Sequence, residues 1–253
     1  MKVSIITVVY NAEDTLEDTI LSVHAQQYPE IEHIVIDGAS TDQSVAIITR
    51  HQDKLSQWMS EPDQGIYHAM NKGIRLATGE LIGFLNADDI YQDSGVISRV
   101  AACFEDQSIE ACYADLVYVD QNDTGRVVRY WRSQHYEPGL FEKGWMPAHP
   151  TFFARRRVYQ RCGDFDQKLK FHSDYELTAR MLAIHGINAK YLPEVLVRMR
   201  VGGTTNRSML NILKGNLESY KACRRLGLKL SPLYFFTKFM MRVPQFFLKP
   251  PAT

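Results

Sequence analysis

The segment that decides the fold is VSIITVVY, residues 3–10, near the start of the chain. Its hydrophobic residues are nearly continuous and mostly β-branched, which is typical of a strand buried on both faces of a parallel sheet. Leu16, Ile20 and Val23 follow at a spacing that places them on one side of a helix. The sequence therefore opens with a strand and a helix, the repeating unit of an α/β fold.

The following stretch repeats this alternation. It predicts strands over 34–36, 55–59 and 81–85, and helices that begin at Val45 and span 66–77. Strands that alternate with helices in this way favour parallel pairing through crossover connections. We therefore expect an α/β fold with a Rossmann-like, mostly parallel central sheet flanked by helices.

The second half of the chain has a different pattern. Residues 111–120 and 126–132 predict a hairpin, because the turn-forming Asn122–Gly125 lies between them. A short strand over 151–153, a helix over 174–185 and an extended segment over 189–200 are expected next. Two helices follow, over 209–226 and over 233–243, the second ending at Pro244. We divide the chain into one domain, 1–205, and a helical tail, 206–253.

The composition excludes several classes of protein. The chain has 253 residues, of which 45% are hydrophobic, and no formal net charge, so it is not disordered as a whole. Its four cysteines are widely spaced and form no Cys-x-x-Cys pair, which argues against a disulfide-built module and a thiolate zinc site. Neither a signal peptide nor an apolar run of about 18–20 residues is present, so we expect a cytoplasmic protein.

The charges are unevenly distributed along the chain. Residues 206–253 contain nine Lys or Arg and one acid, Glu218, whereas residues 1–205 carry an excess of eight acidic residues. Six aromatic residues lie between Tyr234 and Phe247, with Lys238 and Arg242 among them. A basic and aromatic tail of this kind predicts binding to an anionic membrane surface, on the inner face of the cell membrane. The alternative is that its aromatic residues pack on the domain or on a second subunit.

Polar residues follow each of the first four predicted strands. They are Tyr10 and Asn11, Asp37, Asp63, and Asp88 with Asp89. Because the carboxyl ends of parallel strands meet at one edge of a sheet, we expect these side chains to share the rim where open α/β sheets bind ligands. For any single residue the alternative is a turn or a helix cap, which Asp and Asn also favour.

The chemistry of this rim points to a metal. No glycine-rich phosphate-binding loop follows the first strand. Clustered carboxylates would repel a diphosphate unless a divalent cation lay between them, and Mg²⁺ or Mn²⁺ suits oxygen ligands. We therefore expect the rim to bind a nucleotide together with a divalent metal.

Four segments in this order resemble the family 2 glycosyltransferases, which have a GT-A fold. They are SIITVVYN (4–11), DGASTD (37–42), EPDQGIYHAMNKG (61–73) and LNADD (85–89). The likeness extends over about residues 2–200 and is greatest to the bacterial branch that builds polysaccharides such as colanic acid, capsule or O-antigen.

The resemblance implies roles for individual residues. Tyr10 would lie near the nucleotide base, and Asp37 would accept a hydrogen bond from it. Asn86-Ala87-Asp88 stands in the place of the family's Asp-x-Asp motif, so Asp88 is the implied metal ligand. Asp89 is implied in nucleotide-sugar binding, where it would assist Asp88 or contact the sugar. Because Asn86 replaces the first acid, the number of protein ligands stays open. The other residues implied in nucleotide-sugar binding are Thr7, Asn11, Asp63, Asn71 and Lys72.

Two later segments resemble the family's catalytic and acceptor regions. FHSDYEL, residues 171–177, resembles the segment that holds the catalytic base, which implies this role for Asp174. An Asp at a helix start is also a common helix cap, so both roles stay open. AHPTFF, residues 148–153, resembles a segment on the acceptor side. The acceptor-side candidates are therefore His149, Trp145 and Glu176.

Together these features predict an inverting, metal-dependent glycosyltransferase. It would move a hexosyl or N-acetylhexosaminyl group from a UDP- or GDP-linked donor to an acceptor hydroxyl, expected on a lipid-linked glycan of a cell-surface polysaccharide. The alternatives are a nucleotidyltransferase and a non-catalytic nucleotide-sugar-binding subunit. Nucleic-acid binding is not expected, because the predicted rim is acidic.

Overall fold

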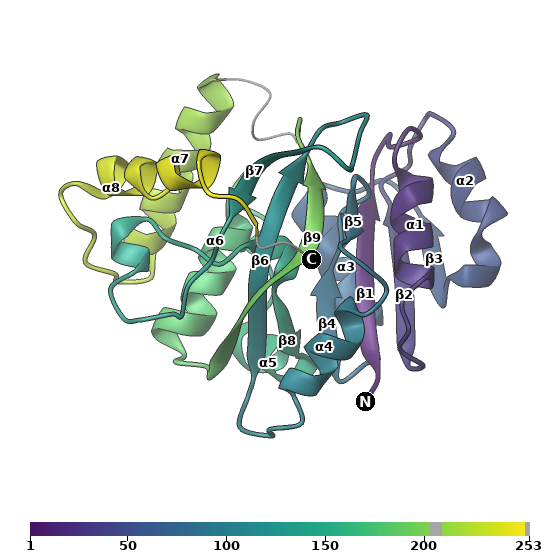
Figure 1. The fold of residues 1–253 in the computed structure, drawn as a ribbon, viewed down its shortest axis with the longest axis horizontal. Coiled ribbons are helices and arrows are strands. Elements are labelled where there is room, and N and C mark those ends of the chain that lie inside the picture. Colours follow the sequence, from purple (N-terminus) through teal and green to yellow (C-terminus); the bar gives the residue numbers. More distant parts are fainter. Residues whose placement is uncertain (203–208, 251–253) are drawn as a thin grey trace.

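The computed structural model describes residues 1–202 and 209–250. In this part of the chain the strands form one sheet with helices on both of its faces, which confirms the expected α/β class (Figure 1). The strands are β1 Val3–Val9, β2 Ile31–Asp37, β3 Gln57–Ser60, β4 Leu81–Phe84, β5 Asp89–Tyr91, β6 Ala111–Val119, β7 Val127–Trp131, β8 Phe153–Arg155 and β9 Ala189–Arg200. The helices are α1 Leu16–His24, α2 Ser44–Arg50, α3 Ile66–Leu76, α4 Val96–Cys103, α5 Arg156–Cys162, α6 Ser173–Ala179, α7 Met209–Arg225 and α8 Tyr234–Met240.

The first four strands form the parallel part of the sheet. They lie in the order β3-β2-β1-β4, and every one of these pairs is parallel. All seven residues of β1 are buried. Ile6 and Val8 pack in the same core cluster as α3, whereas Val3, Ile5 and Val9 contribute to the clusters under α1, α2 and α4. The continuous hydrophobic run in β1 therefore exists because helices cover both of its faces.

The remaining strands extend this sheet in mixed directions. β8 pairs antiparallel with both β4 and β6, β6 pairs parallel with β9, and β5 joins β9 antiparallel. β7 pairs antiparallel with β6, which confirms the predicted hairpin. The expected all-parallel arrangement thus applies to the first four strands, in which each strand is linked to the next by a helix. Among the later strands that the structure describes, only the β6–β9 pair is parallel.

The tail packs against the end of the domain that carries α6. α8 ends at Met240, three residues earlier than predicted, and Pro244 lies inside a separate 3₁₀ turn, Val243–Phe246. Proline is tolerated there because it stands in the first turn of a helical segment, where its missing N–H has no partner to lose. The predicted boundary between 205 and 206 falls outside the described residues. Among the helices that the structure describes, none combines the length and apolarity needed to cross a membrane.

Gly83 is the point where the parallel and mixed parts of the sheet meet. It pairs with Phe153 across the β4–β8 ladder, and a Cβ built on Gly83 would lie 2.2 Å from Cε1 of the buried Phe153 ring. We expect Gly83→Ala to lower the free energy of unfolding by about 1–3 kcal/mol through overpacking, as measured by urea denaturation. Phe153→Leu completes a double-mutant cycle. The double variant should lose less free energy of unfolding than the sum of the losses in the two single variants. An additive loss would contradict this account.

Candidate active site

The carboxyl ends of β1, β2 and β3 converge on Gly38. A Cβ built on this glycine would lie 2.6 Å from Asp63 Oδ2 and 3.4 Å from Tyr10 Cδ2, so the two side chains flank it. Tyr10 is 67% exposed and presents its ring to solvent. The structure therefore brings the first and third predicted strand ends together as an aromatic surface beside a carboxylate.

Asp37 organises the loop between these strand ends. Its buried carboxylate accepts hydrogen bonds from Ser40 N at 3.0 Å, from Ser60 Oγ at 2.6 Å and from Ser40 Oγ. Asn11 supports the same loop, because its backbone N–H donates to Ser40 Oγ and its Oδ1 accepts from the Thr41 N–H at 2.9 Å. Both residues therefore fix the shape of the rim, and their contact with a nucleotide stays a prediction.

The Asn86–Asp89 loop is braced from two sides. On one side two hydroxyls donate hydrogen bonds to the loop backbone. Thr15 Oγ1, just before α1, donates to Ala87 O at 2.9 Å, and Thr19 Oγ1 of α1 donates to Asp89 O at 2.8 Å. On the other side Arg200, the last residue of β9, donates to Asp88 O at 2.9 Å. This bracing fixes the backbone of the loop that carries the implied metal ligand.

Asp88 and Asp89 differ in environment. Asp89 is fully buried, and burial together with the neighbouring Asp88 charge raises its pKa well above the usual range. Its carboxylate is held by Asn86 Nδ2 at 3.3 Å and by the Arg200 N–H at 3.3 Å. Asp88 is half-buried. Of the two carboxylates, Asp88 is the one placed to reach a ligand.

The oxygen donors of this loop fit a divalent cation shared with a substrate. Asn86 Oδ1 is buried and has no hydrogen-bond partner, so a cation bound there would give this oxygen a partner. Across the described residues, no cluster of three or more His, Cys, Asp or Glu could hold an ion by itself. Mg²⁺ typically takes one or two protein carboxylates and completes its shell with phosphates and water. Asp88 therefore fits a metal that arrives with a diphosphate.

Asp174 lies in the first turn of α6 and is reached from two other segments. Its Oδ2 is 3.1 Å from His149 Nδ1, and its Oδ1 is 3.4 Å from the Tyr67 hydroxyl. Tyr67 belongs to the first turn of α3 and also donates to Phe171 O at 2.8 Å. The Asp174 side chain is 15% exposed and that of His149 28% exposed, so both remain open to solvent. The structure thus brings Asp174 and His149 together, 25 positions apart in the sequence.

Three predicted donor-binding residues are occupied inside the protein. Thr7 is fully buried, and its hydroxyl lies 3.0 Å from His33 Nε2. Both polar atoms of the Asn71 amide bond to the backbone of Phe165. Lys72 is buried and pairs with Glu61 at 2.8 Å. We therefore expect these three to support the rim from beneath, rather than to touch a ligand.

Two predicted acceptor-side residues also serve the interior. Trp145 packs in the core with its ring centroid 5.4 Å from that of Phe141 and 5.9 Å from that of Tyr136. Glu176 forms a buried pair with Arg180 at 2.9 Å, and Arg180 also donates to Asp164 O. This geometry favours structural roles for both, which leaves His149 as the acceptor-side candidate beside Asp174.

Arg200 and Tyr67 are two residues of the site that no sequence pattern singles out. Arg200 ends a long extended segment two positions before Gly202, and a charged residue at that point usually faces solvent. Tyr67 looked like an ordinary aromatic residue of an amphipathic helix. Their roles depend on contacts with residues more than 100 positions away, which no local pattern reveals.

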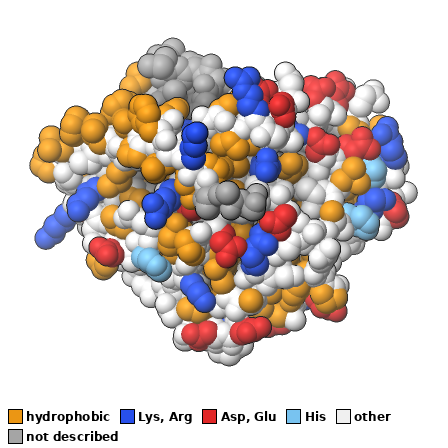
Figure 2. All heavy atoms as spheres, in the orientation of Figure 1, with side chains coloured by type: hydrophobic (Ala, Val, Ile, Leu, Met, Phe, Trp, Pro, Cys, Tyr) orange, Lys and Arg blue, Asp and Glu red, His pale blue; other side chains and the backbone are white. Residues whose placement is uncertain are grey.

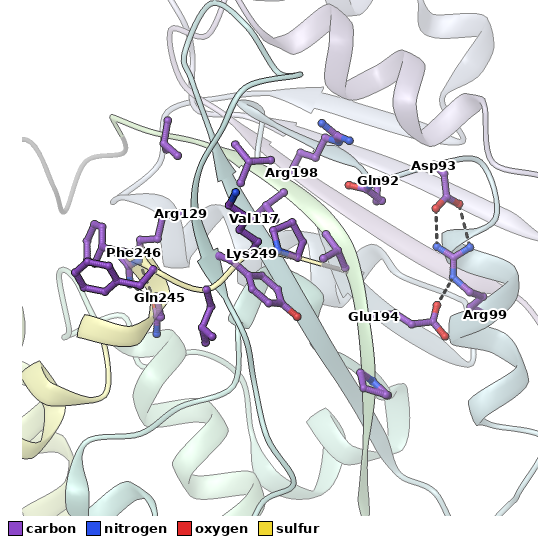
Figure 3. A pocket seen from close by; sticks show the side chains of 18 residues that line it. Gln92, Asp93, Arg99, Val117, Arg129, Glu194, Arg198, Gln245, Phe246 and Lys249 are labelled. Atoms are coloured by element: carbon purple, nitrogen blue, oxygen red, sulfur yellow. Dashed lines mark hydrogen bonds and ion pairs between the residues drawn. The ribbon is translucent and has the colours of Figure 1, made fainter. Parts of the chain in front are cut away.

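A hollow of about 680 Å³ lies away from this site, between the sheet and the end of the chain (Figure 3). Arg99 of α4 closes one end of it by pairing with Asp93 at 2.8 Å and with Glu194 at 2.9 Å. Phe246, Arg129 and Lys249 lie toward the other end. None of the predicted site residues lines it, so it does not belong to the candidate active site.

The family comparison agrees with the residues that form the rim. Residues 4–165 match the model of the family described as "Glycosyl transferase family 2". This range covers the strand ends from Tyr10 to Asp89 and includes His149, but it stops before Asp174.

Relatives of the chain include two mycobacterial proteins. An uncharacterized glycosyltransferase of Mycobacterium tuberculosis is 45% identical over 98 residues, which is 38% of this chain and 37% of that protein, so the match spans little more than a third of its length. A PGL/p-HBAD biosynthesis glycosyltransferase of Mycobacterium bovis is 26% identical over 230 residues, 90% of this chain and 87% of that protein.

Solved structures show the same fold. The mannosyltransferase PcManGT from Pyrobaculum calidifontis, in complex with GDP-Man and Mn²⁺, has a TM-score of 0.70 at 18% identity and covers 95% of this chain and 69% of that chain. The structure of residues 1–349 of TarS from S. aureus, in complex with UDP-GlcNAc, has a TM-score of 0.67 at 17% identity. The match covers 94% of this chain and 69% of the TarS chain. These likenesses confirm the expected GT-A fold.

His33, which supports the rim beneath Thr7, makes stability depend on pH. Burial lowers its pKa from 6.5 to about 3, so the folded state holds the neutral ring and only the unfolded state takes up a proton between these values. As the pH falls below 6.5, the free energy of unfolding should drop by about 1.4 kcal/mol per pH unit on account of this group. His33→Gln, which keeps a polar group for Thr7, should remove that part of the slope. We would measure the free energy of unfolding of both proteins by urea denaturation at pH 7, 5 and 4. If it fell equally with pH in both proteins, His33 would not be the group responsible.

Proposed function

The chain belongs to glycosyl transferase family 2, and we propose that it transfers a sugar, with inversion, from a nucleotide diphosphate donor to an acceptor hydroxyl. The observation that carries this proposal is the role of α3. Asp63 Oδ1 accepts a hydrogen bond from Gly65 N at 2.7 Å just before the helix, and Tyr67 in its first turn reaches Asp174. The rim and the carboxylate proposed as base are therefore held by one short segment of chain.

On the donor side, the residues of the rim that are accessible to solvent would have separate roles. We propose that Tyr10 stacks on the base, which its exposed ring allows. Asp88 would hold a Mg²⁺ or Mn²⁺ ion, which when bound supplies the charge that stabilises the diphosphate leaving group.

On the acceptor side, Asp174 would act as general base. Its carboxylate takes the proton of the acceptor hydroxyl while the hydroxyl oxygen forms a bond to the anomeric carbon and the bond from that carbon to the diphosphate oxygen breaks. A single displacement of this kind inverts the anomeric configuration. His149, 3.1 Å from Asp174 Oδ2, fixes the carboxylate and leaves Oδ1 beside Tyr67.

The donor and acceptor are proposed by class. Solved structures of the same fold hold UDP-GlcNAc or GDP-Man, which supports a UDP- or GDP-linked hexosyl or N-acetylhexosaminyl donor. The acceptor we propose is a lipid-linked glycan in the assembly of a cell-surface polysaccharide, at the cytoplasmic face of the membrane. A relative named for PGL/p-HBAD biosynthesis supports a glycan-assembly role, although it does not point to the colanic acid, capsule or O-antigen branch.

A donor hydrolysis screen tests the proposed class of reaction. The protein would be incubated with Mn²⁺ or Mg²⁺ and a panel of UDP- and GDP-sugars, and we expect slow release of nucleotide diphosphate from one donor. EDTA and Asp88→Ala should each lower this release at least about a hundredfold, because the metal contributes several kcal/mol to leaving-group stabilisation. Asp53→Ala, on an exposed turn remote from the rim, is the matched control.

If no donor in the panel released nucleotide diphosphate but calorimetry still found donor binding, the alternative of a non-catalytic nucleotide-sugar-binding subunit would be favoured. Release that persists in EDTA would remove the metal from the proposal.

Asp174→Asn separates catalysis from binding. Water replaces the acceptor in the hydrolysis assay, and loss of the general base should slow the reaction about 10²–10⁴-fold. Because the amide is nearly isosteric, calorimetry should find donor affinity within about twofold of the parent. Asp123→Asn, in the exposed β6–β7 turn, controls for the change of charge. Turnover near that of the parent would show that Asp174 is not the base.

A further inference from the structure

We infer that the outer face of α8 and the segment after it form a docking surface for an anionic lipid bilayer. We call this face the α8 surface. It consists of Leu233, Phe235, Phe236, Phe239, Met240, Phe246, Phe247 and Leu248, which are all exposed. Phe236 and Phe239 are 60% and 65% exposed, and Phe247 is 80% exposed. Figure 2 shows hydrophobic side chains gathered over α8, with Lys and Arg side chains around them.

The helix has the reverse of the usual polarity for a helix on a water-soluble domain. Its buried side is formed by Tyr234 and Lys238, which are one helical turn apart. The Lys238 ammonium donates to Ser219 Oγ at 2.7 Å and lies 4.8 Å from the centre of the Tyr175 ring. A helix that buries a lysine while it exposes phenylalanines leaves much of its apolar area unpartnered by the chain itself.

The α8 surface is held rigidly outward. Thr237 Oγ1 donates to Lys143 O at 2.6 Å, and a Cβ built on Gly144 would lie 2.5 Å from Lys238 Cβ, so the helix backbone lies directly on this turn. Beyond the helix, Gln245 is buried and accepts a hydrogen bond from Arg129 Nε at 2.8 Å. Rotation of α8 that would bury its phenylalanines would have to break both attachments.

The charged side chains of the segment that carries this surface, 213–250, are cationic except for Glu218. Six exposed cations lie along α7 and in the segments after it. They are Lys214, Lys221, Arg224 and Arg225 in α7, then Lys229 and Lys249. None of them forms an ion pair with a described carboxylate. The one acid over 213–250 is Glu218, and it is turned inward to accept hydrogen bonds from the backbone N–H groups of Lys170 and Phe171.

This combination selects a bilayer over a second copy of the chain. A symmetric dimer through the α8 surface would set the same cations against each other, and like charges at an interface are unfavourable. Anionic headgroups match the cations, while aromatic and leucine side chains can enter the boundary between headgroups and acyl chains. The contact we infer is peripheral, because only side chains of the α8 surface would enter the bilayer.

Vesicle binding tests this inference without any nucleotide sugar, so its outcome is independent of the proposed transferase activity. The full chain would be sedimented with vesicles of phosphatidylcholine alone, and with vesicles of equal parts phosphatidylcholine and phosphatidylglycerol. We expect binding to the second kind only, weakened by added salt. Phe236→Ser with Phe239→Ser should lower the partition coefficient about tenfold or more, and Lys229→Glu with Lys249→Glu should do the same.

The controls come from the opposite end of the molecule, where α1 and α2 lie (Figure 1). Leu21→Ser removes an exposed apolar side chain there, and Arg50→Glu reverses an exposed charge. Both should bind vesicles like the parent, and circular dichroism should show all variants folded. Failure of the parent to bind anionic vesicles, or undiminished binding by the Phe236/Phe239 variant, would overturn the inference. If the parent were a dimer in gel filtration and the Phe236/Phe239 variant a monomer, the partner of the α8 surface would be a second copy of the chain and not a bilayer.

Discussion

One buried guanidinium joins the two halves of this protein. Arg200 pairs with Asp18 of α1 at 2.5 Å and donates to Asp88 O, while its backbone N–H donates to the Asp89 carboxylate. A buried charge costs several kcal/mol unless it is paired and hydrogen-bonded, so this arrangement is stable only when all three segments are in place. The loop that carries Asp88 therefore takes its shape from an arginine 182 positions beyond Asp18. The mixed half of the sheet supports the rim that the parallel half presents.

A second constraint sets the relation between the rim and Asp174. α3 lies close on β1, since a Cβ built on Gly73 would lie 2.3 Å from Ile6 Cγ2. The start of this helix is thereby fixed relative to the strand that ends at Tyr10. Because Asp63 stands just before the helix and Tyr67 is in its first turn, the same helix fixes both the donor rim and the neighbourhood of Asp174. Close packing of α3 on β1 thus serves geometry as well as stability.

Sequence periodicity and turn chemistry predicted the elements of this fold well, because β1 and α3 each show a clear hydrophobic pattern over a whole element. The meeting of Tyr10 and Asp63 at one rim also followed from the rule that parallel strands end together. What could not be predicted was the direction of individual side chains. Thr7 lies in a strand that is buried on both faces, and Asn71 lies on the inner side of α3. Only tertiary contacts decide whether a polar group at such a position meets a ligand or another segment of the protein. The mixed pairing of the later strands was hidden for the same reason.

The tail shows how two readings of one sequence can both apply. Its aromatic residues could pack on the domain or face a membrane, and α8 does the first with Tyr234 and leaves Phe236 and Phe239 for the second. The buried lysine sharpens this point, because burial and the nearby Arg242 lower the pKa of Lys238 to about 7, which is a cost that an apolar residue at that position would avoid. If the helix were turned so that a phenylalanine took the place of Lys238, the ammonium would be solvated and the phenylalanine would be buried. Both changes would be favourable in water. That the chain holds the opposite orientation, with Thr237 and Gln245 fixing it, is understandable if the outer face meets lipid, where phenylalanine is the favoured side chain and an outward ammonium at that depth is not.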